Sequence, residues 1–226
     1  MLPKLEIACF NLESAIIAEQ AGADRIELCR HYDLGGLTPS ELDIAEATKK
    51  IKIPIFVMIR CKADSFVYSL NEIEQMKQSI AFCKKHAVAG FVFGALTKFG
   101  EVDVFACKEL IDAANPLPVT FHRAIDECIE IEASIRTIIT LGFKRILSSG
   151  KANSAIEGIH QLKSWQKKFG QQIIFLPGGS VRSSNIVQLM QNTACSEFHS
   201  AAVTNDSGNC DATEIKKIKQ LILQHA

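Results

Sequence analysis

The sequence predicts an α/β fold in which eight strand-helix units close into one barrel. Short apolar runs alternate with longer amphipathic runs along the whole chain, as expected for a parallel sheet with connecting helices. Several amphipathic runs end at a glycine turn that leads into the next apolar run. No linker or change of composition divides residues 1–226 into two domains. We therefore expect a single (β/α)8 TIM barrel.

The expected strands are short runs of apolar and β-branched residues bounded by turn signals. They lie at residues 5–9, 25–29, 55–60, 90–95, 118–122, 145–149, 173–178 and 197–201. The amphipathic segments between them include residues 12–22, 69–86 and 130–142, which we expect to be helical. The turns AGAD, VAGF and LGFK mark where helices return the chain to a strand. A doubly wound open sheet is the alternative, but no GxGxxG follows the first expected strand, and we infer no organic cofactor.

The composition excludes several functional classes. Lysine plus arginine number 25 and aspartate plus glutamate number 25, so no net charge attracts nucleic acid or an anionic membrane. The start MLPKLEIACF lacks the pattern of a secretory leader, and no apolar stretch is long enough to span a membrane. Eight cysteines without a CxxC pair favour reduced thiols over a disulfide framework or zinc finger. A cytoplasmic protein is the expectation.

Polar residues recur at the strand positions expected to face the barrel interior. Alternation along the strands points six side chains inward if Leu5, Ile26, Phe121 and Phe198 face the helices. The six are Glu6, Glu27, Thr120, His122, Glu197 and His199. Buried carboxylates require partners, and we expect Arg60 and Arg123 to be the counter-charges of Glu6 and Glu27. The two arginines fit either a structural ion-pair network or a clamp for an anionic ligand.

The stretch VTFHRAID ends the fifth expected strand with ionisable groups at the barrel mouth, where ligands bind in this fold. His122 is a candidate general acid or base, and Glu27 is its candidate partner in proton exchange. Asp126 is a catalytic candidate or a cap for the next helix. His199 and Ser200, followed by small residues, are candidates for ligand binding at the last strand.

The stretch LPGGS, residues 176–180, follows the seventh expected strand. Gly178 and Gly179 would let backbone N–H groups approach a ligand, and the loops after strands seven and eight often hold phosphate in such barrels. An ordinary tight turn also explains the two glycines.

Three thiols, those of Cys9, Cys29 and Cys61, end the first three expected strands, which are neighbours around the mouth. Thiolates are soft ligands that favour Cu(I). The alternative is that each cysteine is a small buried apolar residue.

The sequence resembles the CutC family of copper-homeostasis proteins along nearly its whole length. The matching words, in order, are LEIACF, GADRIELC, GGLTPS, PIFVMIR, GFVFGALT, PLPVTFHRAID, RILSSG, LPGG and EFHSAA. Residue by residue, the family pattern is matched by Glu6, Glu27, Cys29, Arg60, His122, Arg123, Asp126 and His199. Three departures lie at the mouth: RCKADSF stands where relatives usually read RPRGGDF, Ser180 replaces a glycine, and Ala201 replaces a serine.

The resemblance implies a cytoplasmic barrel, self-association into a homo-oligomer, and a role in copper handling with Cu(I) bound through cysteine. Two hypotheses follow. In the first, Cys29 with Cys9, joined by Cys61, binds Cu(I). In the second, the protein is an enzyme for a small anionic or phosphorylated substrate, held by Arg60, Arg123 and the Gly178–Gly179 turn, while Glu27 and His122 exchange protons.

Overall fold

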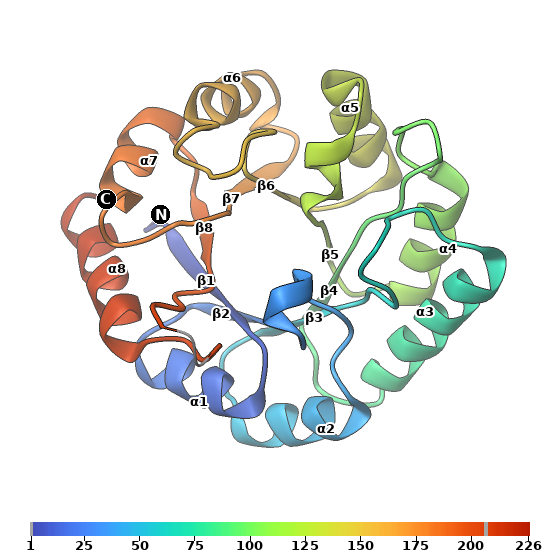
Figure 1. Ribbon diagram of the computed structural model, residues 1–226, viewed down its shortest axis with the longest axis horizontal. Helices are drawn as coiled ribbons and strands as arrows, with labels where there is room; N and C mark the ends of the chain where they lie inside the picture. The colour runs from blue at the N-terminus through green and yellow to red at the C-terminus, as the bar shows by residue number, and fades with distance from the viewer. Residues whose placement is uncertain (1, 206–207) are drawn as a thin grey trace.

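The computed structural model describes residues 2–205 and 208–226. Eight parallel strands form a nearly closed barrel and eight α-helices surround it in the described chain (Figure 1). The strands are β1 (Lys4–Cys9), β2 (Arg25–Leu28), β3 (Ile55–Met58), β4 (Gly90–Phe93), β5 (Val119–Phe121), β6 (Arg145–Ser148), β7 (Ile174–Pro177) and β8 (Glu197–Ser200). Their hydrogen-bonded order runs from β7 down to β1 and on to β8, and β8 packs beside β7 to complete the ring.

The helices alternate with the strands, which confirms the predicted (β/α)8 architecture. They are α1 (Leu12–Gln20), α2 (Glu41–Lys50), α3 (Leu70–Cys83), α4 (Val104–Ala114), α5 (Ile131–Leu141), α6 (Ile159–Phe169), α7 (Ile186–Thr193) and α8 (Ala212–Gln224). Two short 3₁₀ turns, η1 (Tyr32–Leu34) and η2 (Arg123–Glu127), follow β2 and β5. All eight expected strands are present, most of them one or two residues shorter because the chain leaves the sheet early to build the mouth loops.

Local sequence signals explain where several helices begin. The side chain of Asn11 accepts the N–H of Ser14 at the start of α1, and Asp103 does the same for Ala106 at the start of α4. Before α3, Ser69 and Glu72 form a reciprocal capping box. These caps fix the residue at which each of the three helices begins after its loop.

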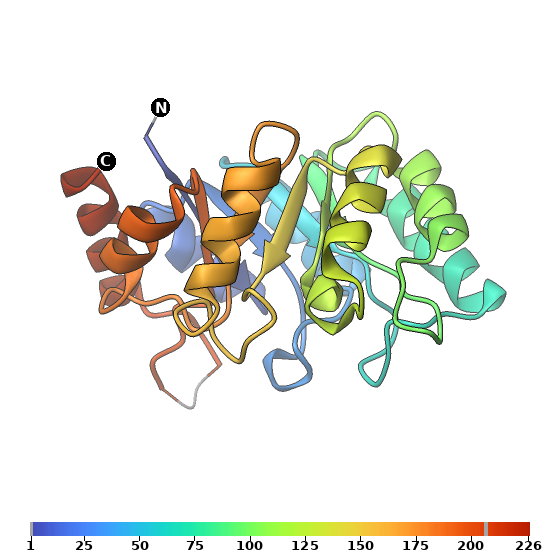
Figure 2. The ribbon, with the colours of Figure 1, turned by 90° about the horizontal axis from the view of Figure 1, so that it is seen from above.

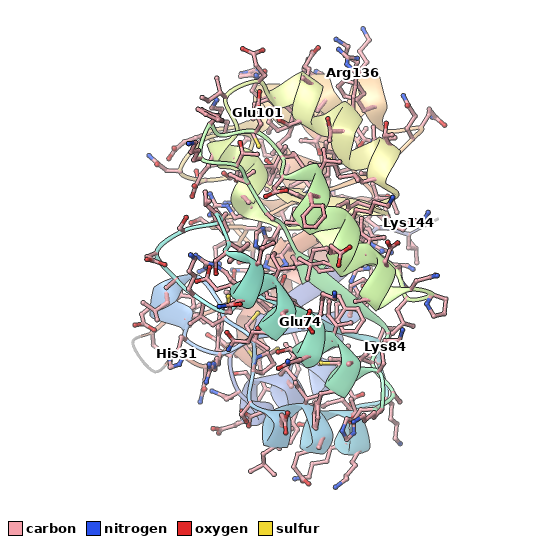
Figure 3. All side chains as sticks on the ribbon, turned by 90° about the vertical axis from the view of Figure 1, so that its right-hand side faces the viewer. His31, Glu74, Lys84, Glu101, Arg136 and Lys144 are labelled. Atoms are coloured by element: carbon pink, nitrogen blue, oxygen red, sulfur yellow. The ribbon has the colours of Figure 1, made fainter. Side chains whose placement is uncertain are left out.

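The alternation predicted for the strands is observed. Leu5, Ile26, Phe121 and Phe198 belong to the large apolar cluster between the sheet and the helices, together with helix residues such as Ile80 and Ile138. A second, smaller cluster of Cys29, Phe56, Met58 and Val92 lies inside the barrel. The outer faces of the helices carry exposed charges such as Glu74, Lys84 and Arg136 (Figure 3). No described helix is both long and apolar enough to cross a membrane.

The amino-terminal half of the barrel interior is filled by an ion-pair network. Arg25 donates to both Glu6 and Glu197, and Arg145 donates to Glu197 over 2.8 Å. Both guanidinium groups also lie over the ring of Phe56. This part of the barrel is thus closed. The other end carries η1 and the remaining strand-to-helix loops, opposite the two chain termini (Figure 2), and there the interior stays open.

Candidate functional site

A cavity of about 280 Å³ opens at the carboxyl end of the strands, between the barrel interior and the mouth loops. Six residues predicted from the sequence line it: Glu27, Arg60, His122, Arg123, Gly179 and His199. Its other lining residues are Ala8, Phe10, Tyr32, Gly35, Met58, Phe66, Leu147, Asn153, Ser180, Arg182 and Ala201. The cavity therefore receives side chains from most of the strand ends, with both apolar walls and charged groups.

Glu6 lies below the cavity and fixes the orientation of His199. Its Oε1 accepts a hydrogen bond from His199 Nδ1 over 2.7 Å, and its Oε2 accepts one from Arg25. Burial would raise the pKa of Glu6, but the charge of Arg25 and the bond from His199 lower it to about 2. Glu6 is therefore a fixed anion, and it leaves Nε2 of His199 directed toward the cavity.

The expected counter-charge of Glu6 was wrong. Arg25 holds Glu6, whereas Arg60 donates to the backbone oxygens of Leu34, Gly36 and Ala63. Arg25 pairs directly with Glu6 across β1 and β2, and it points inward because it is two residues from Glu27. The same alternation rule, applied two residues before Glu27 in β2, would have found Arg25.

Glu27 is the most unusual carboxyl group of the cavity. Its Oε2 accepts a hydrogen bond from the Cys29 thiol at 3.4 Å and lies 3.8 Å from His199 Nε2. Its Oε1 is fully buried and has no hydrogen-bond partner among the described residues. Burial raises the pKa of Glu27, and the neighbouring imidazole opposes that rise. A carboxyl group in this setting exchanges its proton closer to neutral pH than an exposed glutamate does.

The pKa of the His199 imidazole is raised as well, but for a different reason. Burial alone would lower the pKa of its imidazole, but the carboxyl groups of Glu27 and Glu6 raise it. Glu27, His199 and Glu6 thus form a row of coupled acid–base groups from the cavity inward. Their ligand atoms lie within 4.8 Å of one another, the one grouping of this kind in the described chain. Two oxygens and a nitrogen suit a harder cation than Cu(I), and both oxygens of Glu6 are already engaged.

His122 presents a hydrogen-bond donor to the cavity. Its Nδ1 accepts the backbone N–H of Ala124 over 3.3 Å, so the proton of the neutral ring is on Nε2. That Nε2 is buried and finds no acceptor in the described residues. Burial and the nearby charge of Arg60 lower the pKa of His122 to about 3. The ring packs 4.7 Å from that of Phe66, and Gly94 makes room for it, because a Cβ there would lie 2.8 Å from Nδ1.

Asp126, a catalytic candidate from the sequence, is not a cavity residue. Its carboxylate accepts hydrogen bonds from the backbone N–H groups of Ser149 and Lys151 and from the Ser149 hydroxyl. It also accepts one from Arg123 Nε over 3.0 Å. It does not cap α5, whose first turn begins after Glu130. Asp126 therefore ties the β5 loop to the β6 loop and holds Arg123 in place.

The loop after β7 differs in detail from the expectation. The N–H of Gly178 donates to Ser148 O, so it is not available to a ligand. Gly178 instead permits close packing, because a Cβ there would lie 2.4 Å from Leu147. The N–H groups of Gly179 and Ser180, both in left-handed conformations, donate to no acceptor in the described residues. The available donors of the LPGGS loop are thus shifted by one residue from the predicted pair.

Arg182 and Ser200 share the wall next to this loop. Arg182 lines the cavity and donates to the backbone of Val181 and Val203 and to the Ser200 hydroxyl. Ser200, predicted to contact ligand, instead donates to Val181 O over 2.6 Å. Arg182 could not be predicted as a cavity residue, because it lies in a loop where no alternation determines the direction of a side chain.

The three candidate copper thiols are not brought together. Cys9 pairs with Leu28 across β1 and β2 and faces the helices with it, whereas Cys29 faces the barrel interior. Cys61 lies beyond β3 in a half-buried loop. Burial raises the pKa of all three thiols. Cys9 and Cys29 sit on opposite faces of one sheet, because a difference of one residue in register reverses the side-chain direction.

These features define a (β/α)8 barrel with a polar cavity at the mouth, where this class of fold binds its ligands. Residues 3–204 match the CutC family, and the chain belongs to that family. It is 42% identical over 205 residues to the human protein named copper homeostasis protein cutC homolog, covering 90% of this chain and 75% of the human one. It is 34% identical over 232 residues to a CutC family protein of Xanthomonas campestris, covering 96% and 97% of the two chains.

Solved structures agree with this assignment. The crystal structure of the putative copper homeostasis protein CutC from Streptococcus agalactiae superposes with a TM-score of 0.84 at 31% identity, covering 89% of this chain and 99% of that one. Phosphoribosyl anthranilate isomerase from Thermotoga maritima superposes with a TM-score of 0.67 at 12% identity, covering 99% and 100%. At that identity the second likeness shows the barrel fold alone.

Proposed function

We propose that this protein is an acid–base enzyme that moves a proton on a small anionic carbonyl compound at the barrel mouth. One observation carries the proposal. Glu27 Oε1 needs a donor and His122 Nε2 needs an acceptor. Both atoms are buried without a partner among residues 2–205 and 208–226, and both residues line the same cavity. Leaving such groups unpaired is costly in a folded protein, and a bound ligand that supplies both partners removes that cost.

The two groups suit the two ends of one reaction. Glu27 Oε1, as carboxylate, removes a proton from the carbon next to a carbonyl group, and the electron pair of the broken C–H bond moves toward the carbonyl oxygen. The Nε2–H of His122 donates a hydrogen bond to that oxygen as its charge develops. A neutral imidazole with a pKa of about 3 remains a donor throughout the physiological range. The proton then returns from Glu27 to the substrate at the same or the adjacent atom, so no other reactant is consumed.

His199 and Glu6 support this exchange from below. With its Nδ1 proton directed to Glu6, His199 keeps Nε2 within 3.8 Å of Glu27 Oε2. A protonated His199 favours the carboxylate form of Glu27, and a protonated Glu27 favours neutral His199. His199 thereby adjusts the proton affinity of Glu27, the proposed base. His199 is a positioning residue in this scheme, and Glu27 and His122 are the catalytic residues.

The anionic part of the substrate is assigned to Arg123 and the loop after β7. Arg123 has a side chain that is 44% exposed, whereas Arg182 is half-buried and Arg60 is buried. Next to it, Gly179 and Ser180 supply unused N–H groups. Cationic and N–H donors together bind a carboxylate or phosphate group. Arg60, whose terminal nitrogens hold the backbone, contributes its charge but few free donors.

The test is an exchange screen in D₂O. Purified protein is incubated with pools of small carboxylated and phosphorylated aldehydes, ketones and sugars, and loss of C–H signals is followed by proton NMR. We expect protein-dependent deuterium incorporation next to the carbonyl of at least one compound. The proposal would be contradicted if the protein exchanged the protons of no compound and if no compound shifted the melting temperature of the protein.

A second candidate function is the binding of Cu(I) as cargo by the thiol of Cys29. Cys29 shares the inner cluster with Met58, a cavity-lining thioether, and its Sγ lies 3.4 Å from Glu27 Oε2. Thiolate and thioether sulfur are soft ligands that suit Cu(I). Cu(I) binding by this protein would then depend on Cys29 and not on Cys9, since Cys9 faces the helix layer. An anaerobic Cu(I) titration against a competing chelator tests this candidate. It compares the single variants Cys29→Ser and Cys9→Ser.

A further inference from the structure

Three hydrogen-bond acceptors converge where β8, β1 and β2 lie side by side. Glu27 Oε2 and His199 Nε2 lie 3.8 Å apart, and Glu27 Oε1 is buried with no partner among the described residues. Because Nδ1 of His199 donates to Glu6, Nε2 of the neutral ring carries a lone pair and no proton. The Cys29 thiol, a weak donor, reaches Glu27 Oε2 over 3.4 Å. This corner of the cavity is therefore rich in lone pairs and poor in donors.

The spacing of these atoms suits a shared cation. A separation of 3.8 Å between Glu27 Oε2 and His199 Nε2 is too long for a hydrogen bond. Bonds from Zn²⁺ to nitrogen and oxygen are about 2.0–2.2 Å long, so two ligand atoms of one ion lie at most about 4.2 Å apart. The unpartnered Oε1 of Glu27 is an independent sign, because a buried carboxyl oxygen without a positive or donor partner is costly.

Glu6 occupies the place of an outer carboxylate in a metal site. Its two oxygens are engaged by His199 and Arg25, so Glu6 is not itself a ligand. A histidine that binds a metal generally donates its other ring N–H to a carboxylate, which fixes the ring and strengthens it as a ligand. The 2.7 Å hydrogen bond from Nδ1 to Glu6 has this geometry and leaves Nε2 toward the cavity. Glu27 and His199 are therefore the two residues that can hold an ion.

We propose that Glu27 and His199 form a binding site for a divalent cation, with Zn²⁺ as the ion that their ligand atoms suit best. Imidazole nitrogen and carboxylate oxygen are both common ligands of Zn²⁺, and water from the cavity fills the remaining positions. The group of ligand atoms that lie within 4.8 Å of one another does not include the sulfur of Cys29. The site therefore does not require the thiol on which the Cu(I) candidate depends.

An ion at this site occupies the carboxylate that acts as the base in the proposed function. Zn²⁺ should therefore inhibit proton exchange. The inhibition rests on the proposed function, whereas the binding of Zn²⁺ does not.

Binding is measured by calorimetric titration of metal-free protein with Zn²⁺ at pH 7 and without substrate. We expect one Zn²⁺ per chain. Glu27→Gln and His199→Asn should each weaken binding by on the order of 100-fold, because each removes a ligand and even outer partners contribute about 10–100-fold. The amide of His199→Asn can still donate to Glu6 from near the former position of Nδ1, so this variant isolates the loss of Nε2.

Two variants serve as controls. Cys29→Ser changes a buried neighbour of Glu27 but keeps both ligands, and it should bind Zn²⁺ as the wild type does. His160→Asn removes an exposed imidazole from α6 and should also have no effect. Loss of Zn²⁺ binding in Cys29→Ser with retention in His199→Asn would overturn the assignment of the ligands.

Nitrogen NMR of the wild type gives a result that depends on no variant. One equivalent of Zn²⁺ should shift the Nε2 resonance of His199 while Nδ1 keeps its proton. Absence of Zn²⁺ binding, or binding that leaves this resonance unchanged, would overturn the proposal. A variant that fails to fold therefore does not leave the question open.

The inhibition is tested separately, by following deuterium exchange of a responsive compound as Zn²⁺ is added. Half of the exchange rate should be lost at the Zn²⁺ concentration that half-saturates the calorimetric site. Zn²⁺ binding to a protein that exchanges no compound would support the site and contradict the proposed function. Exchange at the full rate in Zn²⁺-saturated protein would overturn the inhibition.

Discussion

The imidazole of His199 is held to the carboxylate of Glu6 by a 2.7 Å hydrogen bond, and this contact joins the structural network of the barrel to its cavity. Glu6 is completed on its other side by Arg25. One carboxylate therefore belongs both to the buried ion pairs below and to the acid–base groups above. Changes at Glu6 should affect both stability and the titration of His199.

Replacing Glu6 by Gln tests this link. Removal of the negative charge leaves Arg25 with Glu197 alone, and breaking a buried ion pair destabilises by about 3–5 kcal/mol. The pKa of His199 should fall, because one of the two carboxyl groups that raise it is gone. Urea unfolding and histidine NMR titration measure the two effects. Glu132→Gln, which removes a carboxylate from exposed ion pairs on α5, is the control and should change neither.

Acid should destabilise the protein in part through His122. The unfolded chain binds a proton at this histidine near pH 6.5, whereas the folded protein does so only near pH 3. Between these values the unfolded state binds more protons, so the free energy of unfolding falls as the pH falls. His122→Gln removes that contribution. Its stability curve should be shallower by up to about 1.4 kcal/mol per pH unit between pH 6 and pH 4.

The tautomer of His122 has a spectroscopic consequence. Nitrogen NMR of the folded protein at pH 7 should show a neutral ring with its proton on Nε2, because Nδ1 accepts the Ala124 N–H. A ring that carries the proton on Nδ1, or that titrates near pH 6.5, would remove the donor on which the proposed mechanism depends.

Gly94→Ala should disturb the site through packing alone. The new Cβ would lie 2.8 Å from His122 Nδ1 and 2.9 Å from Phe121 Cζ, so both rings must shift. We expect a loss of about 1–3 kcal/mol in the free energy of unfolding. The His122 resonances should move as well. Unchanged resonances in a destabilised variant would show that His122 does not depend on the space above Gly94.

The fold was accessible from the sequence because each strand is a short apolar run and each connection ends in a turn signal. Strand alternation also placed Glu27, His122 and His199 inside the barrel correctly. Alternation does not extend into the loops, because loop conformation has no sequence period. It therefore could not predict the direction of the Arg182 side chain or the available N–H of Ser180.

Inorganic phosphate offers a simple probe of the anion-binding wall. Ligand that binds only the folded state raises the melting temperature with concentration. Phosphate should do so for the wild type, and Arg123→Gln should reduce the shift severalfold because it removes the charge beside Gly179. Arg136→Gln, on the outer face of α5 (Figure 3), should leave the shift intact. Equal shifts in all three proteins would mean that phosphate binds elsewhere.

The most direct measurement of the central claim is the rate of deuterium incorporation into a responsive carbonyl compound by the wild type, Glu27→Gln and His122→Gln. If Glu27 is the base and His122 the donor to the oxyanion, each variant should lose on the order of 100-fold or more in rate while retaining the fold. Glu27→Gln should lose the most, because it removes the proposed base itself. Exchange that persists at the wild-type rate in both folded variants would contradict the account.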